Sequence, residues 1–245
     1  VNTISNNDTS GGIAKSMADT ITEFSDLWES NSYDLIFVLG DRYEMFAAAS
    51  STIPFNIPLA HLHGGETTLG AIDDKFRHAI TAMSTYHFTS SEEHKKRVID
   101  IIGTDKNVFN VGTLSLEFIN DLNITPKHTN NILFCYHPET VNLNNEESIN
   151  DVCDALDSID ATFTVLLPNN DTDHNVVRDI IQKRLVGSKY KISKALSYNE
   201  YYTELANCKC MLGNSSSGIY EAASFGKYAI NIGDRQKGRN TGGNV

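Results

Sequence analysis

The stretch from His61 to His78, HLHGGETTLGAIDDKFRH, gathers imidazole, carboxylate and guanidinium side chains around a Gly-Gly pair. Histidine titrates near neutral pH and a carboxylate can accept or return a proton, so this combination suits acid–base chemistry. The same residue types also bind metal ions. Three interpretations therefore stand at the outset: an acid–base site, a metal site, or a polar loop without chemistry.

A metal site would be built on the paired histidines of this stretch. His61 and His63 alternate along an expected strand, which predicts that both imidazoles point to the same face, as two zinc ligands would. Asp41, Glu66 and His137 could supply further ligands, but none of their spacings is diagnostic of zinc. We therefore expect no metal and no other cofactor.

Carboxylates for proton transfer come from two places in the first half of the chain. Asp73 and Asp74 open an expected helix, and Asp41 and Arg42 directly follow the apolar run DLIFVLG. Asp41 could handle a proton while Arg42 holds a phosphate. The structural alternatives are helix capping for the aspartate pair, and a cap with a salt bridge for Asp41 and Arg42.

A candidate anion site follows a late apolar run. GNSSSG, residues 213–218, stands before the expected helix IYEAASFG, where unpaired backbone N–H groups favour an anion and Ser215, Ser216 and Ser217 add hydroxyl donors. Glu221, one turn into that helix, could accept hydrogen bonds from ribose hydroxyls. A simple serine cap is the alternative. Neither standard glycine-rich nucleotide fingerprint is present.

Further polar residues of the second half suit a nucleotide. GDRQKGR supplies Arg235 with two more cations, a focused positive patch that suits a diphosphate, although a solvated basic loop would have the same composition. His137 ends the run ILFCYH and could donate to a phosphate or act as an acid, or simply bond to backbone. Asn169, after TVLLP, could meet a ribose or base edge, or only form a turn.

These residues all follow expected strands in a chain that alternates strand and helix. Short, unbroken apolar runs predict buried parallel strands, and apolar residues at helical spacing predict the helices between them. The polar segment 121–131 predicts a linker, and therefore domains 1–122 and 123–245. Because ligands gather at the carboxyl ends of parallel strands, we expect α/β architecture with two doubly wound Rossmann-like domains facing a cleft.

Composition narrows the possible partners. The chain has 245 residues, with 20 basic and 31 acidic residues and a formal net charge of -11, which argues against a nucleic-acid or anionic-membrane surface. The four cysteines include no CxxC pair, and no apolar run approaches the roughly 18 residues of a membrane span, so we expect a cytoplasmic protein. The start at Val1 and the terminal TGGNV predict truncation at both ends.

Six motifs in this order, GDRYE, HLHGGE, IDDKFRHAIT, HPET, GNSSSGIYEA and INIGDRQKGR, resemble the hydrolysing UDP-N-acetylglucosamine 2-epimerases, close to their sialic-acid-pathway branch. The resemblance spans essentially the whole chain. It implies a GT-B-like fold, with UDP-N-acetylglucosamine between the domains, no metal, and a homo-oligomer of two or four subunits. It also implies conversion to N-acetylmannosamine and UDP through a glycal. A related nucleotide sugar, diacetamido-trideoxy or GDP-linked, and a two-domain glycosyltransferase are the alternatives.

The resemblance also implies residue roles. Asp41 and Asp74 match catalytic carboxylates, and His137 lies beside the diphosphate. Where many relatives have a glutamate this chain has His63, so either His63 or Glu66 carries the proton transfer, with Asp73 a further candidate. The positions matched to UDP contacts are Arg42, Asn169, Ser215, Ser216, Glu221 and Arg235, to which the serine loop adds Ser217.

Overall fold

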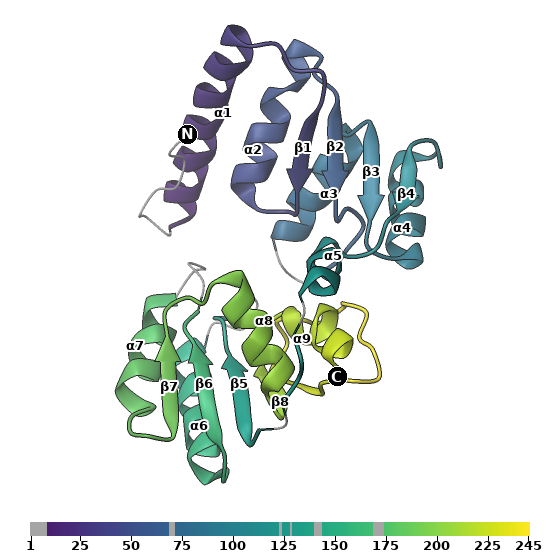
Figure 1. Ribbon diagram of the computed structural model, residues 1–245. Helices are drawn as coiled ribbons and strands as arrows, with labels where there is room; N and C mark the ends of the chain where they lie inside the picture. Colours follow the sequence, from purple (N-terminus) through teal and green to yellow (C-terminus); the bar gives the residue numbers. More distant parts are fainter. Residues whose placement is uncertain (1–8, 69–71, 123, 128, 140–143, 169–173) are drawn as a thin grey trace. The chain divides into compact units, whose positions relative to one another are not determined.

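The computed structural model describes residues 9–68, 72–122, 124–127, 129–139, 144–168 and 174–245 (Figure 1). The chain divides into two compact units, Val1–Leu114 and Ser115–Val245. The division falls before the boundary expected at residue 122, because a helix that was not predicted, α5 (Leu114–Asp121), places Ile119 against the apolar core of the second unit.

The first unit alternates helices and strands as predicted, with element ends shifted by a few residues at most. Its elements are α1 (Ser10–Ser30), β1 (Ile36–Leu39), α2 (Tyr43–Ser51), a 3-10 turn (Ile53–Phe55), β2 (Leu59–Leu62), α3 (Asp73–Met83), β3 (Tyr86–Thr89), α4 (Glu92–Ile102) and β4 (Val108–Asn110).

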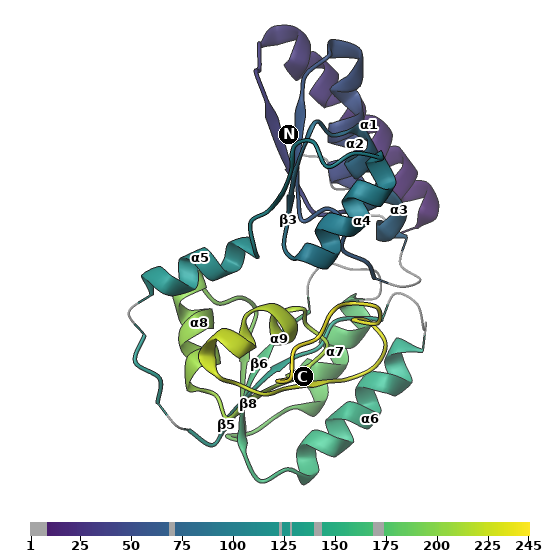
Figure 2. The same cartoon turned by 90° about the vertical axis from the view of Figure 1, so that its right-hand side faces the viewer.

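The four strands of the first unit form one parallel sheet in the order β1-β2-β3-β4. Because each strand pairs with the next one along the chain and such crossovers are right-handed, α2, α3 and α4 lie on the same face of the sheet (Figure 2). Helix α1 packs on α2. The core beneath these helices contains Val38, Ala49, Leu59 and Ile80.

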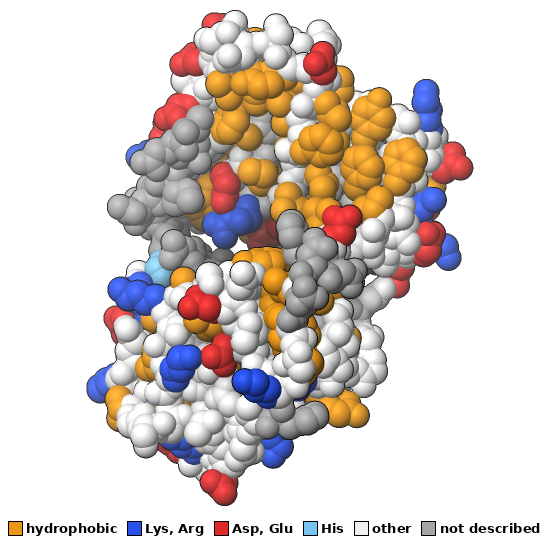
Figure 3. All heavy atoms as spheres, viewed as in Figure 1, with side chains coloured by type: hydrophobic (Ala, Val, Ile, Leu, Met, Phe, Trp, Pro, Cys, Tyr) orange, Lys and Arg blue, Asp and Glu red, His pale blue; other side chains and the backbone are white. Residues whose placement is uncertain are grey.

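The other face of this sheet carries exposed apolar side chains. Phe37 is 62% exposed, and Leu39, Phe109 and Val111 are also exposed (Figure 3). Phe88 stacks with both Phe37 and Phe109. Its ring centroid lies 6.4 Å from that of Phe37 and 5.6 Å from that of Phe109. Among the described residues of this unit, the helices lie on the opposite face.

The second unit contains a longer series of elements. They are α5, β5 (Asn131–Cys135), α6 (Asn145–Ser158), β6 (Thr162–Leu166), α7 (His174–Arg184), β7 (Tyr190–Ser193), α8 (Tyr198–Asn207), β8 (Cys210–Gly213), α9 (Ser217–Tyr220), a 3-10 turn (Ala222–Phe225) and β9 (Ala229–Asn231). The continuous helix expected after the serine loop is therefore wrong, because a four-residue α9 passes into the 3-10 turn, which ends at a left-handed Gly226.

The second sheet is parallel and doubly wound, in the order β7-β6-β5-β8-β9. From β5 the chain adds strands first on one side of the sheet (β6, β7) and then on the other (β8, β9). Open α/β sheets bind ligands at such a switch point, which here lies between β5 and β8. Alternate residues of β5 serve the two faces: Ile132 and Phe134 pack with α6 and α7, whereas Leu133 and Cys135 pack with α8. These two parallel α/β units confirm the predicted fold class.

In the parts of the chain that the structure describes, each helix is too short or too polar to cross a membrane.

Candidate functional site

The polar residues of the first unit meet at the carboxyl ends of its strands. Asp41 and Arg42 follow β1, the segment 63–66 follows β2, and Ser90 follows β3. Because the strands are parallel and adjacent, these three loops lie along one edge of one sheet. The predicted gathering of site residues at strand ends is therefore present within this unit.

One buried arginine joins two of the predicted carboxylates. The Arg77 side chain is only 3% exposed; it forms an ion pair with Asp41, and its Nη1 lies 3.4 Å from Oδ1 of Asp74. Both carboxylate oxygens of Asp74 also accept hydrogen bonds from the Thr68 backbone N–H, at 2.7 and 3.0 Å. The guanidinium thus compensates two negative charges and holds loops after β1 and β2 against α3.

The capping alternative for the aspartate pair can be compared with the start of α3. The helix begins after Ile72, whose side chain makes no capping bond, and Asp73 and Asp74 occupy its first turn. Negative charge is favourable there because of the helix dipole. Asp74 additionally accepts hydrogen bonds from Arg77 and from Thr68 in the loop before the helix, contacts that capping does not require. At the start of α2, Arg42 likewise caps without a side-chain bond and instead donates from Nε to Glu44.

The two histidines of HLHGGE have different environments. His61 is fully buried, with Nε2 2.9 Å from the Gly40 carbonyl and Nδ1 3.1 Å from the Thr81 hydroxyl. Burial lowers the pKa of His61 to about 4, so its imidazole is neutral at pH 7. His61 therefore has a structural role, with both ring nitrogens satisfied inside the protein.

The expectation that His61 and His63 point to one face is wrong. Strand β2 ends at Leu62, and His63 has a left-handed backbone with φ 62°, so the alternation of the strand does not continue through it. Across the described residues, groups of three or more histidine, cysteine, aspartate or glutamate side chains placed to hold a metal ion are not found. The paired-ligand hypothesis does not fit this geometry.

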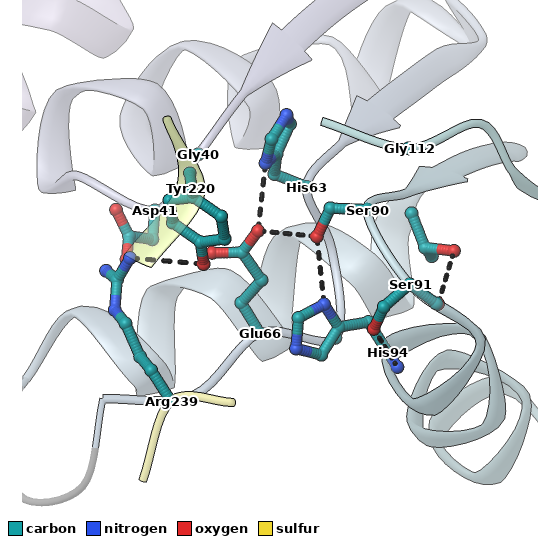
Figure 4. Close-up of polar contacts among 12 residues, drawn as sticks. Gly40, Asp41, His63, Glu66, Ser90, Ser91, His94, Gly112, Tyr220 and Arg239 are labelled. Atoms are coloured by element: carbon teal, nitrogen blue, oxygen red, sulfur yellow. Dashed lines mark hydrogen bonds and ion pairs between the residues drawn. The ribbon is translucent and has the colours of Figure 1, made fainter. Parts of the chain in front are cut away.

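His63 belongs instead to a chain of hydrogen bonds (Figure 4). Its Nδ1 lies 2.8 Å from Oε1 of Glu66; the Ser90 hydroxyl donates to the same oxygen at 2.8 Å and lies 2.9 Å from Nδ1 of His94. The Glu66 side chain is 6% exposed. A Cβ on Gly65, where φ is +80°, would lie 2.3 Å from the His94 carbonyl oxygen, so glycine lets the loop approach α4.

In the second unit, an asparagine clamps the end of β5. Asn214 is fully buried; its side chain accepts from the His137 N–H at 2.7 Å and donates to the His137 carbonyl at 2.8 Å. Its own carbonyl accepts from Gln236 at 2.7 Å. The His137 imidazole is itself buried, with Nε2 3.4 Å from the Cys135 sulfur. Asn214 thus fixes the β5 end, the serine loop and the basic loop together.

The three serines of the serine loop make different side-chain contacts. Ser216 is the residue before α9, yet its side chain makes no capping hydrogen bond. Ser215 hydrogen-bonds the Cys135 thiol, whose pKa burial raises to about 11 against the opposing influence of Ser215 and Arg235. Glu221, which follows α9, has one buried carboxylate oxygen that lacks a hydrogen-bond partner among the described residues. Such an oxygen is suited to accept from a ligand.

The basic loop is fixed at its start by Glu139. Its Oε1 accepts from the Asp234 N–H at 2.9 Å, and a Cβ on Gly233 would collide with this carboxylate. Arg235 follows directly, close enough to Cys135 for its charge to act on the thiol, and Arg239 donates to the Tyr220 hydroxyl at 3.3 Å (Figure 4). Arg235 thereby lies beside the β5 end and the serine loop. Asn169 lies outside the described residues.

Sequence reasoning missed several residues that organise these loops. Ser90 could be placed at a strand end, but neither its bond to Glu66 nor that to His94 has a sequence signature. The motifs IDDKFRHAIT and GNSSSG contain Arg77 and Asn214, but neither motif indicates the contacts that these two residues make. Asp41, Glu66 and His137 come from distant segments, so spacing along the chain carries no signal for these contacts, whereas Asp74 and His94 lie only three and four residues from Arg77 and Ser90.

Two parallel α/β units with polar loops at their carboxyl edges define a protein of the two-Rossmann-unit, GT-B-like class. Residues 2–245 match the sequence profile of the UDP-N-acetylglucosamine 2-epimerase family, and the chain belongs to this family. The resemblance seen in the six motifs is therefore confirmed at the level of family.

Two curated relatives are similar to nearly the whole of this chain. The chain is 38% identical to the GDP/UDP-N,N'-diacetylbacillosamine 2-epimerase (hydrolyzing) of Campylobacter jejuni subsp. jejuni serotype O:2, over 95% of this chain and 65% of that protein. It is 38% identical to the polysialic acid biosynthesis protein P7 of Escherichia coli, over 95% and 63%. The chain thus spans less than two thirds of each relative's length.

The solved structure is that of the UDP-GlcNAc 2-epimerase from Neisseria meningitidis bound to UDP-GlcNAc. It aligns with a TM-score of 0.75 at 17% identity, over 95% of this chain and 68% of that chain. At this identity the likeness concerns the fold.

Proposed function

We propose that this chain carries the proton-transfer and nucleotide-binding elements of a hydrolysing nucleotide-sugar 2-epimerase. The observation that carries the proposal is the His63–Glu66 pair at the carboxyl edge of the first sheet, in a chain of the UDP-N-acetylglucosamine 2-epimerase family. A base is needed because the proton on carbon 2 of the sugar is only weakly acidic, and it must be removed as the nucleoside diphosphate departs from carbon 1.

The geometry supports His63 as the proton-transfer group and Glu66 as the residue that orients it. A carboxylate can only accept, so the 2.8 Å contact with Glu66 places a hydrogen on Nδ1 of His63. In the neutral imidazole Nε2 is then unprotonated and can take up the carbon 2 proton. Glu66, with a second donor in Ser90, is held as an acceptor and stabilises the imidazolium that forms.

The reaction proceeds in two stages. In the first, the carbon 2–hydrogen and carbon 1–oxygen bonds break, the nucleoside diphosphate leaves, and a glycal with a carbon 1–carbon 2 double bond remains. In the second, water adds its oxygen to carbon 1, and a proton reaches carbon 2 from the opposite face. Asp41, Asp73 and Asp74 are the candidates for handling these second-stage protons, and Arg77 fixes Asp41 and Asp74 in place.

The second unit is proposed to hold the nucleoside diphosphate. The serine loop, which follows β8 at the switch beside β5, supplies Ser215, Ser216 and Ser217, and the basic loop after β9 supplies Arg235. Positive charge and hydroxyl donors compensate the leaving group. The buried carboxylate oxygen of Glu221 is assigned to a ribose hydroxyl. His137, Arg42 and Asn169 remain predicted nucleotide contacts on the family resemblance alone.

The names of the relatives favour one substrate over our first expectation. The Campylobacter relative at 38% identity is named for nucleotide-linked N,N'-diacetylbacillosamine, whereas the solved UDP-GlcNAc enzyme is 17% identical. We therefore place UDP- or GDP-linked N,N'-diacetylbacillosamine ahead of UDP-N-acetylglucosamine. UDP-N-acetylglucosamine stays the second candidate substrate, because the E. coli relative is named for polysialic acid biosynthesis. Assembly into a dimer or tetramer also stays a prediction of the family resemblance.

Proton NMR in heavy water tests the proposal with each of these nucleotide sugars. We expect free 2-epimeric sugar carrying deuterium at carbon 2, formed without an acceptor, which would also exclude a glycosyltransferase. His63→Gln is expected to lower exchange and product formation by roughly 100-fold or more while UDP affinity, measured by calorimetry, is retained. Absence of both exchange and free sugar with every nucleotide sugar would overturn the proposal. Exchange retained in His63→Gln and lost in Glu66→Gln would transfer the role to Glu66.

A further inference from the structure

Ser90 and His94 lie behind the proposed acid–base pair and are not needed to contact a substrate. Ser90 follows β3, and His94 stands in the first turn of α4, where its backbone N–H is bound by the cap residue Ser91 at 3.2 Å. The His94 residue is 6% exposed. The partly buried Ser90 and the buried His94 continue the hydrogen-bond chain that begins at His63 (Figure 4).

We propose that Ser90 and His94 are positioning residues that fix the Glu66 carboxylate and, through it, the tautomer of His63. The inference rests on the proposed function of the His63–Glu66 pair. It assigns a role in the chemistry to two residues that do not touch the sugar.

The direction of each bond in the chain follows from counting hydrogens. The Ser90 hydroxyl has one hydrogen, and it is donated to Oε1 of Glu66. Its 2.9 Å contact with His94 can then be made only if Nδ1 of His94 donates. His94 therefore carries its hydrogen on Nδ1. Two donors, Ser90 and His63, converge on one oxygen of Glu66.

Burial favours a neutral His94. Burial lowers the pKa of His94, and Arg97 and Arg77 act in the same direction, whereas Glu66 and Glu93 oppose them. These groups come from α4, α3 and the loop after β2, the elements around the imidazole. A neutral His94 with hydrogen on Nδ1 acts as a fixed donor over the pH range in which His63 would work.

Removing either residue should release Glu66 without touching the substrate site. In Ser90→Ala, Oε1 of Glu66 loses the hydrogen bond from Ser90, and the orientation of the carboxylate is less firmly fixed. The His63 imidazole then loses its single orientation, and the tautomer with the hydrogen on Nε2, which cannot accept the carbon 2 proton, becomes populated. The rate should fall while substrate binding stays, because the groups that bind the diphosphate are unchanged.

Steady-state kinetics over a pH series test the proposal on the whole chain. Ser90→Ala and His94→Leu are expected to lower kcat by roughly 10- to 100-fold, with KM and UDP affinity changed less than about twofold. Ser90→Thr keeps a hydroxyl, and His94→Asn keeps a donor near the position of Nδ1, so both should recover most of the rate. The matched control is Ser91→Ala, which removes the cap of α4 next in the chain and should lower stability but not kcat.

Two results would overturn the proposal. Equal loss of kcat in Ser91→Ala would show that the effect comes from weakening α4, and full kcat in Ser90→Ala would show that Glu66 needs no second donor. Nitrogen NMR of the His63 ring provides a readout that does not depend on turnover. We expect the Nδ1–H tautomer in the parent chain and a mixture in Ser90→Ala. If the parent chain shows no epimerase activity, the proposed function fails, whereas an unchanged tautomer in Ser90→Ala refutes the positioning role itself.

Discussion

At the scale of single residues, two histidines two positions apart have unrelated tasks. His61 lies in strand β2, and its ring nitrogens contact the Gly40 carbonyl and the Thr81 hydroxyl. His63 leaves the strand with a left-handed backbone and meets Glu66. The difference arises from one backbone torsion, which directs one ring into the core and the other to a buried carboxylate at the sheet edge. Under the proposed function, it is the second of these rings that moves a proton.

The burial of His61 predicts an acid-sensitive first unit. Folding lowers its pKa from 6.5 to about 4, so below pH 6.5 the unfolded chain binds a proton that the native chain does not. The free energy of unfolding should therefore be unaffected by His61 above pH 6.5, fall as the pH drops, and be lower by about 2 kcal/mol at pH 5. Urea unfolding at pH 7.5 and pH 5 measures this.

The control for this prediction is His61→Gln, which cannot titrate. It should be less stable at pH 7.5 but lose about 2 kcal/mol less than the parent between the two pH values. An NMR titration of the His61 ring, with no protonation above pH 5, provides a second check. Equal losses in parent and variant, or a ring that titrates near 6.5, would refute the assignment.

At the scale of elements, the switch between β5 and β8 depends on close backbone approach. Gly213 has φ +135°, and a Cβ there would lie 1.9 Å from the Cys135 carbonyl oxygen. The next residue, Asn214, binds the His137 backbone at two points. Glycine at the end of β8 thus allows the two strand ends, and the loops that follow them, to occupy the same small region.

Gly213→Ala should therefore lower the free energy of unfolding of the second unit by about 3 kcal/mol and weaken UDP binding. The reason is a clash with backbone, which a side-chain rotation cannot relieve. Gly226→Ala is the matched control: its φ is +64°, but nothing lies within 4 Å of the added Cβ, so only about 1 kcal/mol of backbone strain is expected. Denaturant unfolding and calorimetry with UDP compare the two variants. Similar effects in both would contradict a special role for this crossing.

At the scale of the whole molecule, the two units have separate cores and separate proposed tasks. The first, Val1–Leu114, holds the acid–base residues, and the second, Ser115–Val245, holds the serine and basic loops. The first unit also presents the apolar sheet face around Phe37 and Phe109, whereas the second has apolar cores on both sides of its sheet. Nucleotide binding should thus be separable from the chemistry.

We expect the unit Ser115–Val245, expressed alone, to fold and to bind UDP within about tenfold of the affinity of the whole chain, since the residues proposed to hold the diphosphate, apart from Arg42, belong to it. Val1–Leu114 should not bind UDP. Calorimetry measures both affinities, and circular dichroism checks folding. Arg235→Ala in the isolated second unit serves as the control and should abolish most of the binding. UDP affinity found only in the whole chain would refute this division.

Periodicity and turn chemistry predicted most of the elements from the sequence alone. The segments YKIS, EEHKKRVIDII and CMLG coincide with strand β7, helix α4 and strand β8, because the apolar patterns that favour each element are local. The polar clusters after the strands also marked the candidate loops correctly within each unit, since parallel strands bring their carboxyl ends to one edge. Helix α5 was missed because its short pattern is stabilised by the core of the second unit.

Tertiary structure alone decided how the candidate residues work together. Arg77 joins Asp41 to Asp74, Ser90 joins Glu66 to His94, and Asn214 holds His137, each across segments far apart in the chain. Sequence patterns record periodicity and spacing, which fix where a strand or helix forms. They do not record which side chains meet after folding, because a hydrogen bond depends on positions within a few tenths of an ångström and on single torsions such as that of His63.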